Sequence, residues 1–460
     1  MQQKGYSVNE EALRIIEECE SWYKNDEIDK FHKRKNLNDK EICLSRMNFA
    51  KRCCADDANL CEIIGISPDE KSSATGFIDE LLKKNRFNVQ YRKQLEKVSA
   101  TGTVGSYLTL KDATYLENPD GSTIVKGGEP KIVYVDADCI IPLTIENDEV
   151  LECAFCATNT VKGNSQTTLV IFVCDEGKYK AETVVFDKAG AIIKDSSAEL
   201  QLGEQKPFSI MTNAEVNNLD NMDGYGLPKI YNAIPLLKAV DLCFNLLYGD
   251  LEKGDKLVFI NELLACIQVD EKGEPKLSAQ QKELFILLGD KLPQQDSIIK
   301  EYNPEIRVDT ITSAFELVLS LLSMSFGYGT KKYSFENGQI KTATEYIGER
   351  QDAMQELNKQ RKNASDYITD IIRAAMWFSN QFSGTTYSLD EELMIEFDDS
   401  FIEDKATKLE SMRADAVTFQ DIPWLTFTYI KTKYNLSDEE AEKYINEGKV
   451  RMEPTDDSDD

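Results

Sequence analysis

The chain has 460 residues, too many for one compact core, so two or more domains are expected. It is strongly acidic, with 81 Asp and Glu against 53 Lys and Arg and a net charge of −28. This balance argues against a protein that grips DNA or an anionic membrane, because such grip comes from cations that neutralise phosphates. It does not argue against a surface past which DNA slides.

Histidine and cysteine usage excludes further classes of site. His32 is the only histidine, which rules out mechanisms that need two, including most zinc hydrolase sites. It lies in the basic segment 30–35 and is predicted to be exposed. The eleven cysteines are scattered and no signal-peptide pattern opens the chain, which predicts free, mostly buried thiols in a reducing cytoplasm. Cys153 and Cys156 form a lone CxxC in a strand-like stretch, so buried thiols are favoured over a metal or redox pair.

The sequence pattern of the N-terminal half changes from helical to strand-like near residue 100. Helices are predicted before that point, and short alternating strands separated by turns are predicted from about 100 to 208, as an antiparallel sheet. The chain is therefore expected to be α+β. The predicted helices are 10–22, 39–58 and 73–87, and the clearest strands are 131–135, 169–173 and 183–186.

Two apolar helices are predicted after a polar loop at 213–226. They cover residues 232–250 and 309–326, and Gly327 ends the second. The second helix is apolar nearly all round, so it must be surrounded, either by neighbouring subunits or inside a large monomer. Between them lies a small mixed module, with strands predicted at 257–260 and 266–269 and a short helix at 279–288.

The C-terminal part is predicted to be mainly helical. A turn-rich segment, 328–341, holds Lys331, Lys332 and Lys341 and a strand-like stretch at 332–335. Thr342 and Glu345 form a capping box, and so do Ser437 and Glu440. The predicted elements are a long helix from 342 to about 378, a strand at 393–397, helices at 404–417, 424–433 and 438–448, and a disordered acidic end at 453–460.

Motifs that carry chemistry are missing from the sequence. It contains no GxxxxGK[ST], GxSxG or HExxH pattern, and the loop 217–224 fails the EF-hand spacing. Asp398, Asp399, Glu403 and Asp404 could hold a hard metal, but a charged helix start explains them better. The apolar run 311–326 contains Glu316 and is shorter than the ~20 residues of a membrane span. We therefore expect no enzyme, no cofactor, no metal and no membrane contact.

The order of elements resembles the portal proteins of long-tailed bacteriophages of Gram-positive hosts, from about residue 22 to 447. Each matching piece is weak alone, but together they keep the same order around two apolar helices that bracket a small module. The pieces are 21–23 (SWY), 47–51 (MNFAK), 140–143 (IIPL), 225–228 (YGLP), 237–241 (LKAVD), 341–345 (KTATE) and 397–400 (FDDS). The N-terminal arm and the C-terminal helical region are short for this family.

The resemblance implies a division of the chain and a set of site residues. The DNA-facing tunnel loop would use Lys331, Lys332, Asn337, Gln339 and Lys341. Taken alone, without the resemblance, the lysines of that segment are better explained as solvated loop residues. The stem would contact neighbouring subunits through Leu237, Phe244, Phe315, Leu319 and Leu322. The implied parts are a wing (1–231), a first stem helix (232–250), a clip (251–308), a second stem helix (309–326), a tunnel loop with long helix and wing return strand (327–398), and a crown with acidic tail (399–460).

The resemblance also implies a function. Such proteins form closed rings, usually dodecamers, at the portal vertex of the virion, and they assemble in the bacterial cytoplasm. The ring is a channel for double-stranded DNA in packaging and ejection. It would dock the terminase large subunit and later the head–tail adaptor, and it would contact the major capsid and scaffolding proteins. Two alternatives stay open: another phage head or head–tail protein, such as a minor capsid or adaptor component, and a cytoplasmic enzyme with an unfamiliar site.

Overall fold

The chain folds into two compact units, which are described separately. The first contains Met1–Asn59 and Gly76–Asp390, and the second contains Leu60–Thr75 and Glu391–Asp460. The computed structural model describes residues 5–26, 31–35, 39, 41–68, 72–117, 123–161, 163–254, 257–261, 285–288, 299–303, 305–333, 335, 343–398, 405–419, 422–434 and 436–446.

Four helices and a small ribbon make up the N-terminal part. The predicted helix at 10–22 is confirmed as α1 (Glu10–Lys24). The helix predicted at 39–58 is wrong in its first half, because β1 (Lys33–Lys35) and β2 (Glu41–Cys43) pair as an antiparallel ribbon. Asn48, at a left-handed φ of 55°, precedes the helix, which is confined to α2 (Phe49–Leu60). The region predicted as one helix at 73–87 holds α3 (Thr75–Lys84), and α4 (Phe87–Thr101) follows a left-handed Arg86.

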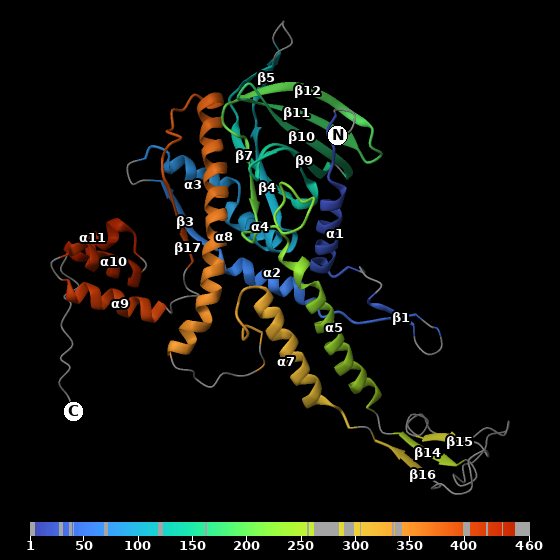
Figure 1. Cartoon of the computed structure of the whole chain (residues 1–460). Coiled ribbons are helices and arrows are strands. Elements are labelled where there is room, and N and C mark those ends of the chain that lie inside the picture. Colours follow the sequence, from blue (N-terminus) through green and yellow to red (C-terminus); the bar gives the residue numbers. More distant parts are fainter. Residues whose placement is uncertain are drawn as a thin grey trace. The chain divides into compact units, whose positions relative to one another are not determined.

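The predicted antiparallel sheet is confirmed, as two sheets and a hairpin (Figure 1). The three-stranded sheet has the order β13–β4–β7, and the five-stranded sheet has the order β12–β11–β10–β9–β8. A short 3-10 turn, η2 (Ala137–Cys139), joins β7 to β8. The strands are β4 (Thr103–Lys111), β5 (Thr114–Glu117), β6 (Thr123–Lys126), β7 (Glu129–Asp136), β8 (Ile140–Glu146), β9 (Glu149–Val161), β10 (Asn164–Asp175), β11 (Lys178–Asp187), β12 (Ile192–Gly203) and β13 (Phe208–Thr212).

An aromatic core joins the two sheets. Tyr107 and Phe208 come from the three-stranded sheet, and Phe155 and Phe172 come from the five-stranded sheet. Their ring centroids lie 5.1–5.7 Å apart across the sheets, and all four side chains are buried. Strand alternation places these residues on the inner faces. A single chain therefore completes this core.

Two helices leave this body as an arm. They are α5 (Lys229–Lys253) and α7 (Val308–Ser325), they pack against each other, and we call them the two-helix arm (Figure 1). Both predicted apolar helices are thus confirmed. Between them, β14 (Leu257–Asn261), β15 (Phe285–Leu288) and β16 (Ile299–Tyr302) form a sheet of order β15–β14–β16.

The small module corrects one prediction. Residues 285–288 were expected to end a short helix, but they form β15, parallel to β14 with Val258 opposite Phe285. The four apolar residues of β15 suit a strand as well as a helix, and pairing with β14 decides between the two. The strand predicted at 266–269 and the rest of the predicted helix, 279–284, lie outside the described residues.

The long helix is confirmed as α8 (Ala343–Phe378), and it continues as a π-helical turn, η3 (Ser379–Ser383). It packs against β13 and β4 of the three-stranded sheet. Tyr367 and Ile368 are buried there. Thr342 of the predicted capping box lies outside the described residues.

The second unit combines one strand pair with three helices. β3 (Ile63–Pro68) pairs antiparallel with β17 (Leu393–Phe397), which confirms the predicted strand. The three predicted helices are α9 (Lys405–Thr418), α10 (Pro423–Tyr434) and α11 (Asp438–Asn446). The Ser437–Glu440 capping box is confirmed, because Glu440 accepts a 3.0 Å bond from the Ser437 amide while its own amide donates to Ser437. The acidic end 453–460 lies outside the described residues.

These helices and antiparallel strands agree with the predicted α+β class. The finer division into wing, stem, clip and crown stays a prediction. The two units differ from that division in two places. Residues 60–75, assigned to the wing, and residues 391–398, assigned with the long helix, both belong to the unit of the C-terminal helices.

Candidate functional site

The arm buries a seam between its helices. Leu237, Phe315, Leu319 and Leu322 are at most 6% exposed, and Phe244 is half-buried. These are the five residues predicted to contact neighbouring subunits. That role stays untested, but the single chain already covers four of these side chains. A neighbouring subunit would therefore meet a different set of residues.

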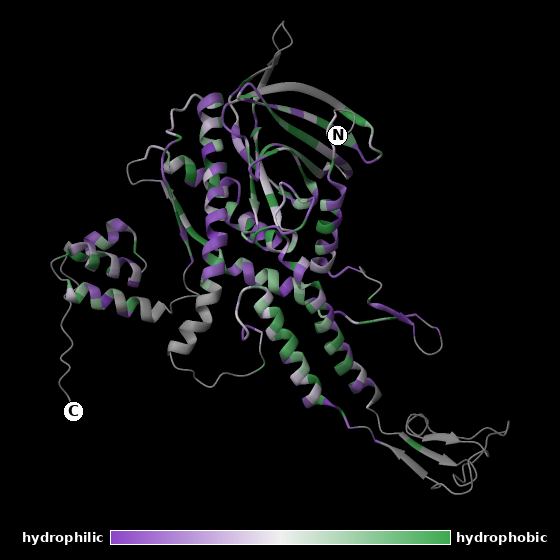
Figure 2. Ribbon diagram, in the orientation of Figure 1, coloured by the Kyte–Doolittle hydropathy of each residue, from purple (hydrophilic) through white to green (hydrophobic). Residues whose placement is uncertain are grey.

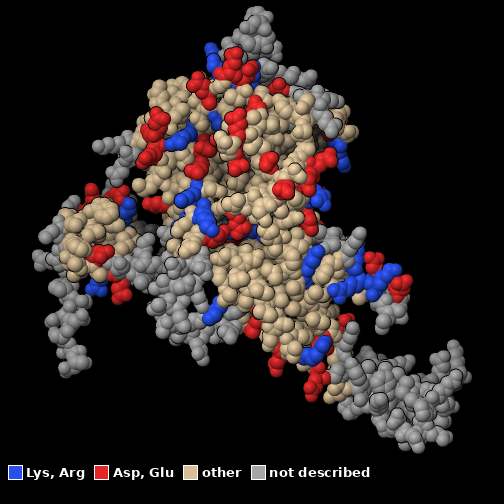
Figure 3. Space-filling model, viewed as in Figure 1, with Lys and Arg blue, Asp and Glu red and all other residues tan. Residues whose placement is uncertain are grey.

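That different set is apolar and exposed. On α7, Leu317, Leu321 and Met324 are 62%, 41% and 57% exposed, and their spacing of four and three places them on one stripe. On α5, Leu246 and Leu251 are also more than half exposed. Packing against α5 therefore leaves one apolar face of α7 exposed. Figure 2 shows apolar residues along both helices, and Figure 3 shows a largely uncharged arm with charges gathered toward its distal end.

An ion pair closes the distal end of the arm. Arg307, which caps the start of α7, donates from Nε and Nη2 to the two carboxylate oxygens of Asp250 near the end of α5, at 2.9 and 2.7 Å. Bidentate pairing of this kind fixes orientation as well as distance. The chain therefore leaves and re-enters the arm at a fixed spacing.

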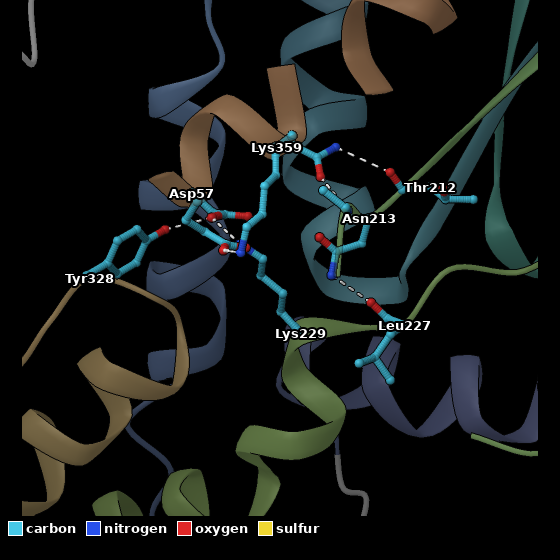
Figure 4. A network of polar contacts seen from close by, with 10 residues as sticks. Asp57, Thr212, Asn213, Leu227, Lys229, Tyr328 and Lys359 are labelled. Atoms are coloured by element: carbon cyan, nitrogen blue, oxygen red, sulfur yellow. Dashed lines mark hydrogen bonds and ion pairs between the residues drawn. The ribbon is translucent and has the colours of Figure 1, made fainter. Parts of the chain in front are cut away.

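A buried polar cluster closes the other end, and we call Asp57, Lys229, Tyr328 and Glu356 the root cluster (Figure 4). Lys229, the first residue of α5, has a side chain only 1% exposed, with Nζ 2.9 Å from Asp57 Oδ1 and 3.2 Å from Glu356 Oε1. The Tyr328 hydroxyl, just after α7, donates to the same Asp57 oxygen at 2.7 Å. Both roots of the arm are thus fixed to α2 and α8.

The electrostatics of the root cluster are those of a structural ion pair. Burial disfavours the charged form of Lys229, but the carboxylates of Asp57 and Glu356 outweigh this effect and raise its pKa. Lys229 is therefore charged and fully partnered. Burial raises the pKa of the nearby Glu215 carboxyl. The Lys229 ammonium opposes this shift, and the carboxylates of Glu356 and Asp57 add to it. Since Lys229 is almost inaccessible, the cluster positions the arm and offers no group to a substrate.

Close backbone contact fixes the loop that leads into α5. A Cβ on Gly102 would lie 2.1 Å from the Gly226 carbonyl oxygen, so glycine is needed there, at a φ of +79°. Asn213 donates its side-chain amide to the Leu227 carbonyl at 2.8 Å, and the Asn217 amide donates to the Tyr225 carbonyl at 3.0 Å. The predicted polar loop is confirmed, and at least these two side-chain amides serve the loop itself.

The predicted DNA-facing residues are only partly visible. Lys331 and Lys332 are exposed in the turn that follows α7, and Lys332 Nζ lies 5.7 Å from the Tyr328 ring centroid. Residues 332–333 form a turn and not the expected strand. Asn337, Gln339 and Lys341 lie outside the described residues. The DNA-facing role therefore stays a prediction.

The prediction that His32 is exposed is wrong. It is 5% exposed, and its Nε2 lies 2.9 Å from Asp241 Oδ2 on α5. The other Asp241 oxygen accepts from the Met47 amide at 2.8 Å. Sequence reasoning missed this pair because the residues beside His32 are basic and exposed. The usable signal was Asp241, an acid on an apolar helical stripe, which needs a buried partner.

The CxxC pair behaves as expected for buried thiols. Cys153 is buried and Cys156 half-buried on β9, and burial raises the pKa of both thiols. Both are free cysteines. Across the described ranges, no cluster of three or more His, Cys, Asp and Glu residues could hold a metal ion. Asp399, Glu403 and Asp404 of the acidic cluster lie outside those ranges.

By length and composition alone, two helices could cross a membrane. They are the two helices of the arm, over Lys229–Glu252 and Val308–Ser325. Core helices of soluble proteins pass the same test, so the finding is weak. The expected absence of membrane contact stays a prediction.

Comparisons with known proteins find no related sequence and a weak structural likeness. No family model matches the chain, and no curated protein matches it. One solved structure that it resembles is described as the neck of a native GTA particle computed with C12 symmetry. The likeness covers 81% of this chain and 86% of the other, with 11% identity and a TM-score of 0.36. A likeness at this level carries no functional argument.

Proposed function

We propose that this chain is the subunit of a ring at the portal vertex of a tailed bacteriophage. The ring, expected to hold about twelve copies on the family pattern, is a channel for double-stranded DNA during packaging and ejection. It docks the terminase large subunit first and the head–tail adaptor later, within a shell of major capsid and scaffolding proteins. It performs no catalysis and binds no cofactor.

One observation carries the proposal: an apolar two-helix arm, fixed at its root, brackets a separate small sheet and leaves a stripe of α7 exposed. Leu317 and Met324, both more than half exposed, belong to that stripe. Soluble monomers rarely expose contiguous apolar patches of this kind unless a partner covers them. Because both helices start and end at fixed points, identical arms can pack around an axis. In such a ring, the contacts are heterologous and close on themselves.

The charge of the chain fits a channel. With a net charge of −28, a ring of copies carries a dense negative field, which repels phosphates and holds no DNA segment. Lys331 and Lys332, in the turn after α7, would touch phosphates transiently. The root cluster fixes the position of this turn through Tyr328.

Particle mass tests the proposal. We expect the purified 52.1 kDa chain to form closed annular particles, seen by light scattering with negative-stain imaging. Leu317→Asp with Leu321→Asp should yield folded chains that do not assemble, because charge is placed on the exposed stripe. Val216→Asp is the matched control, because Val216 is an apolar residue that is 87% exposed and lies outside the arm. A folded monomer at every concentration refutes the ring.

Two further measurements separate the alternatives. A minor capsid or adaptor component would assemble without a central hole. Flotation of the wild-type chain with lipid vesicles would show that the arm enters membranes instead. In packaging reactions, Lys341→Glu should impair DNA uptake by intact rings, and normal uptake would remove the tunnel-loop role.

A further inference from the structure

The β1–β2 ribbon stands out among the exposed features of the first unit. All six residues of β1 and β2 are exposed, including Ile42 at 43%. In the register, Arg34 faces Ile42 and Lys35 faces Glu41. A two-stranded ribbon with both faces in water is marginally stable by itself. The ribbon must therefore be stabilised by the rest of the chain or by a partner, and its contacts with α5 provide that stabilisation.

That base is fixed to one face of α5. His32 contacts Asp241, which also accepts from the Met47 amide. One turn further along, Asn245 accepts from the Ser45 amide at 2.8 Å and donates to the Ser45 carbonyl at 2.6 Å. The Leu44 amide closes the ribbon by donating to the His32 carbonyl at 2.8 Å. The two strands of the ribbon are thus fixed to the arm at their common base.

The ribbon is basic in an acidic chain. Residues 30–46 contain six Lys and Arg but two Asp and Glu, whereas the whole chain has 53 against 81. Figure 1 shows the ribbon beside α5, on the flank away from α7, and Figure 3 shows Lys and Arg gathered there. Charge complementarity therefore points to an acidic partner surface, and the ribbon is directed away from its own α7.

We infer that the ribbon docks on a second copy of this chain, on the exposed face of its α7. This inference depends on the proposed function, because it needs neighbouring arms in a ring. There, the α5 flank of one subunit faces the α7 flank of the next. That flank offers Asp309 and Glu316, seven residues apart, beside the exposed Leu317. Arg34 and Ile42, on one ribbon face, match this mixture of acid and apolar surface.

Cross-linking of the unmodified chain tests the contact directly. Rings assembled from equal amounts of ¹⁴N- and ¹⁵N-labelled chains are treated with a carbodiimide, which joins amines to carboxylates in direct contact. We expect mixed-isotope cross-links from Lys33 or Lys35 to Asp309 or Glu316. Rings that lack such cross-links, while other lysine–carboxylate pairs between subunits react, overturn the inference.

A charge-reversal variant tests its contribution to assembly. Lys33→Glu with Arg34→Glu and Lys35→Glu should raise the concentration of half-dissociation by roughly tenfold or more, since three attractive contacts become repulsive. In about 1 M salt, where the screening length is about 3 Å, the difference from wild type should shrink. The matched control reverses three exposed lysines elsewhere, Lys83, Lys178 and Lys188, and should assemble like wild type.

The outcomes separate this inference from the proposed function. Wild-type rings together with an equally stable ribbon variant overturn the inference and leave the ring standing. A monomeric wild-type chain overturns both. If the ribbon variant assembles normally but retains less DNA, the ribbon contacts nucleic acid, which also overturns the inference. Asp309→Lys with Glu316→Lys in the reversed background should restore assembly, a readout that a folding defect would not give.

Discussion

Apolar side chains are buried in the body formed by the two sheets, whereas several are exposed on the two-helix arm. In the body, Phe155 and Phe172 are at most 1% exposed, within an aromatic core that two sheets of one chain complete. In the arm, Leu319 is buried in the helix seam, yet Leu317, two residues earlier, is 62% exposed. One chain therefore buries the whole aromatic core of the body, but it covers only one apolar face of the arm.

This difference separates stability from assembly. Substitutions in the body should lower the free energy of unfolding and leave subunit contacts alone. Substitutions on the outer stripe of the arm should do the reverse. The root cluster lies where the two regions meet, and substitutions there should affect the fold first and the position of the arm as a consequence.

The largest expected loss of stability comes from the aromatic core. Phe155→Ala should lower the free energy of unfolding by about 3–5 kcal/mol, because it removes a buried ring and leaves a cavity. Urea unfolding measures this. Phe335→Ala is the matched control from the arm side: its ring is 51% exposed and contacts Phe315 at 5.5 Å. It should cost no more than about 1.5 kcal/mol. Equal losses would contradict the contrast between the two regions.

The root cluster comes next. Lys229→Met should cost about 3–5 kcal/mol, because it leaves Asp57 and Glu356 without their buried cation. Lys359→Met is the control, since Lys359 also pairs with Glu356, at 3.3 Å, but its side chain is 62% exposed. That change should stay within about 0.5 kcal/mol. Similar losses from both variants in urea unfolding would show that burial does not decide the effect.

The sequence predicted the arm because its signals are local. Apolar residues spaced by three and four mark α5 and α7, and a glycine ends the second helix. The apolar residues nearly all round α7 also predicted that the helix must be surrounded, by neighbouring subunits or within one large chain. What the sequence could not show was which of those faces the chain covers by itself. Leu319 and Leu322 on one side and Leu317 and Leu321 on the other are indistinguishable by composition.

The missed features depend on long-range partners. Lys229 meets Asp57, 172 residues away, and His32 meets Asp241, 209 residues away. Asp241 on its apolar helical stripe indicates that a buried partner is needed, but no local pattern identifies that partner, and none marks Lys229 as buried. β15 was mistaken for part of a helix for the same reason, because its parallel pairing with β14 is not encoded in its own four residues. The sequence therefore predicted the two helices of the candidate site, but it did not predict the root cluster that fixes them to the body.

Truncating a side chain on the exposed stripe of α7 should weaken assembly and leave the fold stable. Leu317→Ala should change the free energy of unfolding by less than about 0.5 kcal/mol, because the side chain is largely in water. It should nevertheless weaken ring assembly measurably in a dilution series, because the neighbouring subunit is expected to cover that position. Loss of fold stability without any change in assembly would reverse the assignment of the two regions.

The smallest expected effect is a pH dependence beside the root cluster. Burial, together with nearby carboxylates, raises the pKa of Glu215 above its usual 4.5 in the folded chain. The folded state therefore holds a proton more firmly than the unfolded state does. As pH rises from about 4.5 through the raised pKa, the unfolded state loses its proton first, so stability falls across that window.

Glu215→Gln removes this loss, because glutamine stays neutral. At pH 4 the variant and the wild type should unfold at nearly the same urea concentration, and at pH 7 the variant should be the more stable. Glu204 is exposed, so Glu204→Gln is the matched control for loss of a carboxylate, and it should unfold at nearly the wild-type urea concentration at both pH values. A Glu215→Gln variant that is less stable at pH 7 would mean that attraction to Lys229 outweighs desolvation, and the root cluster would then need Glu215 as a full member.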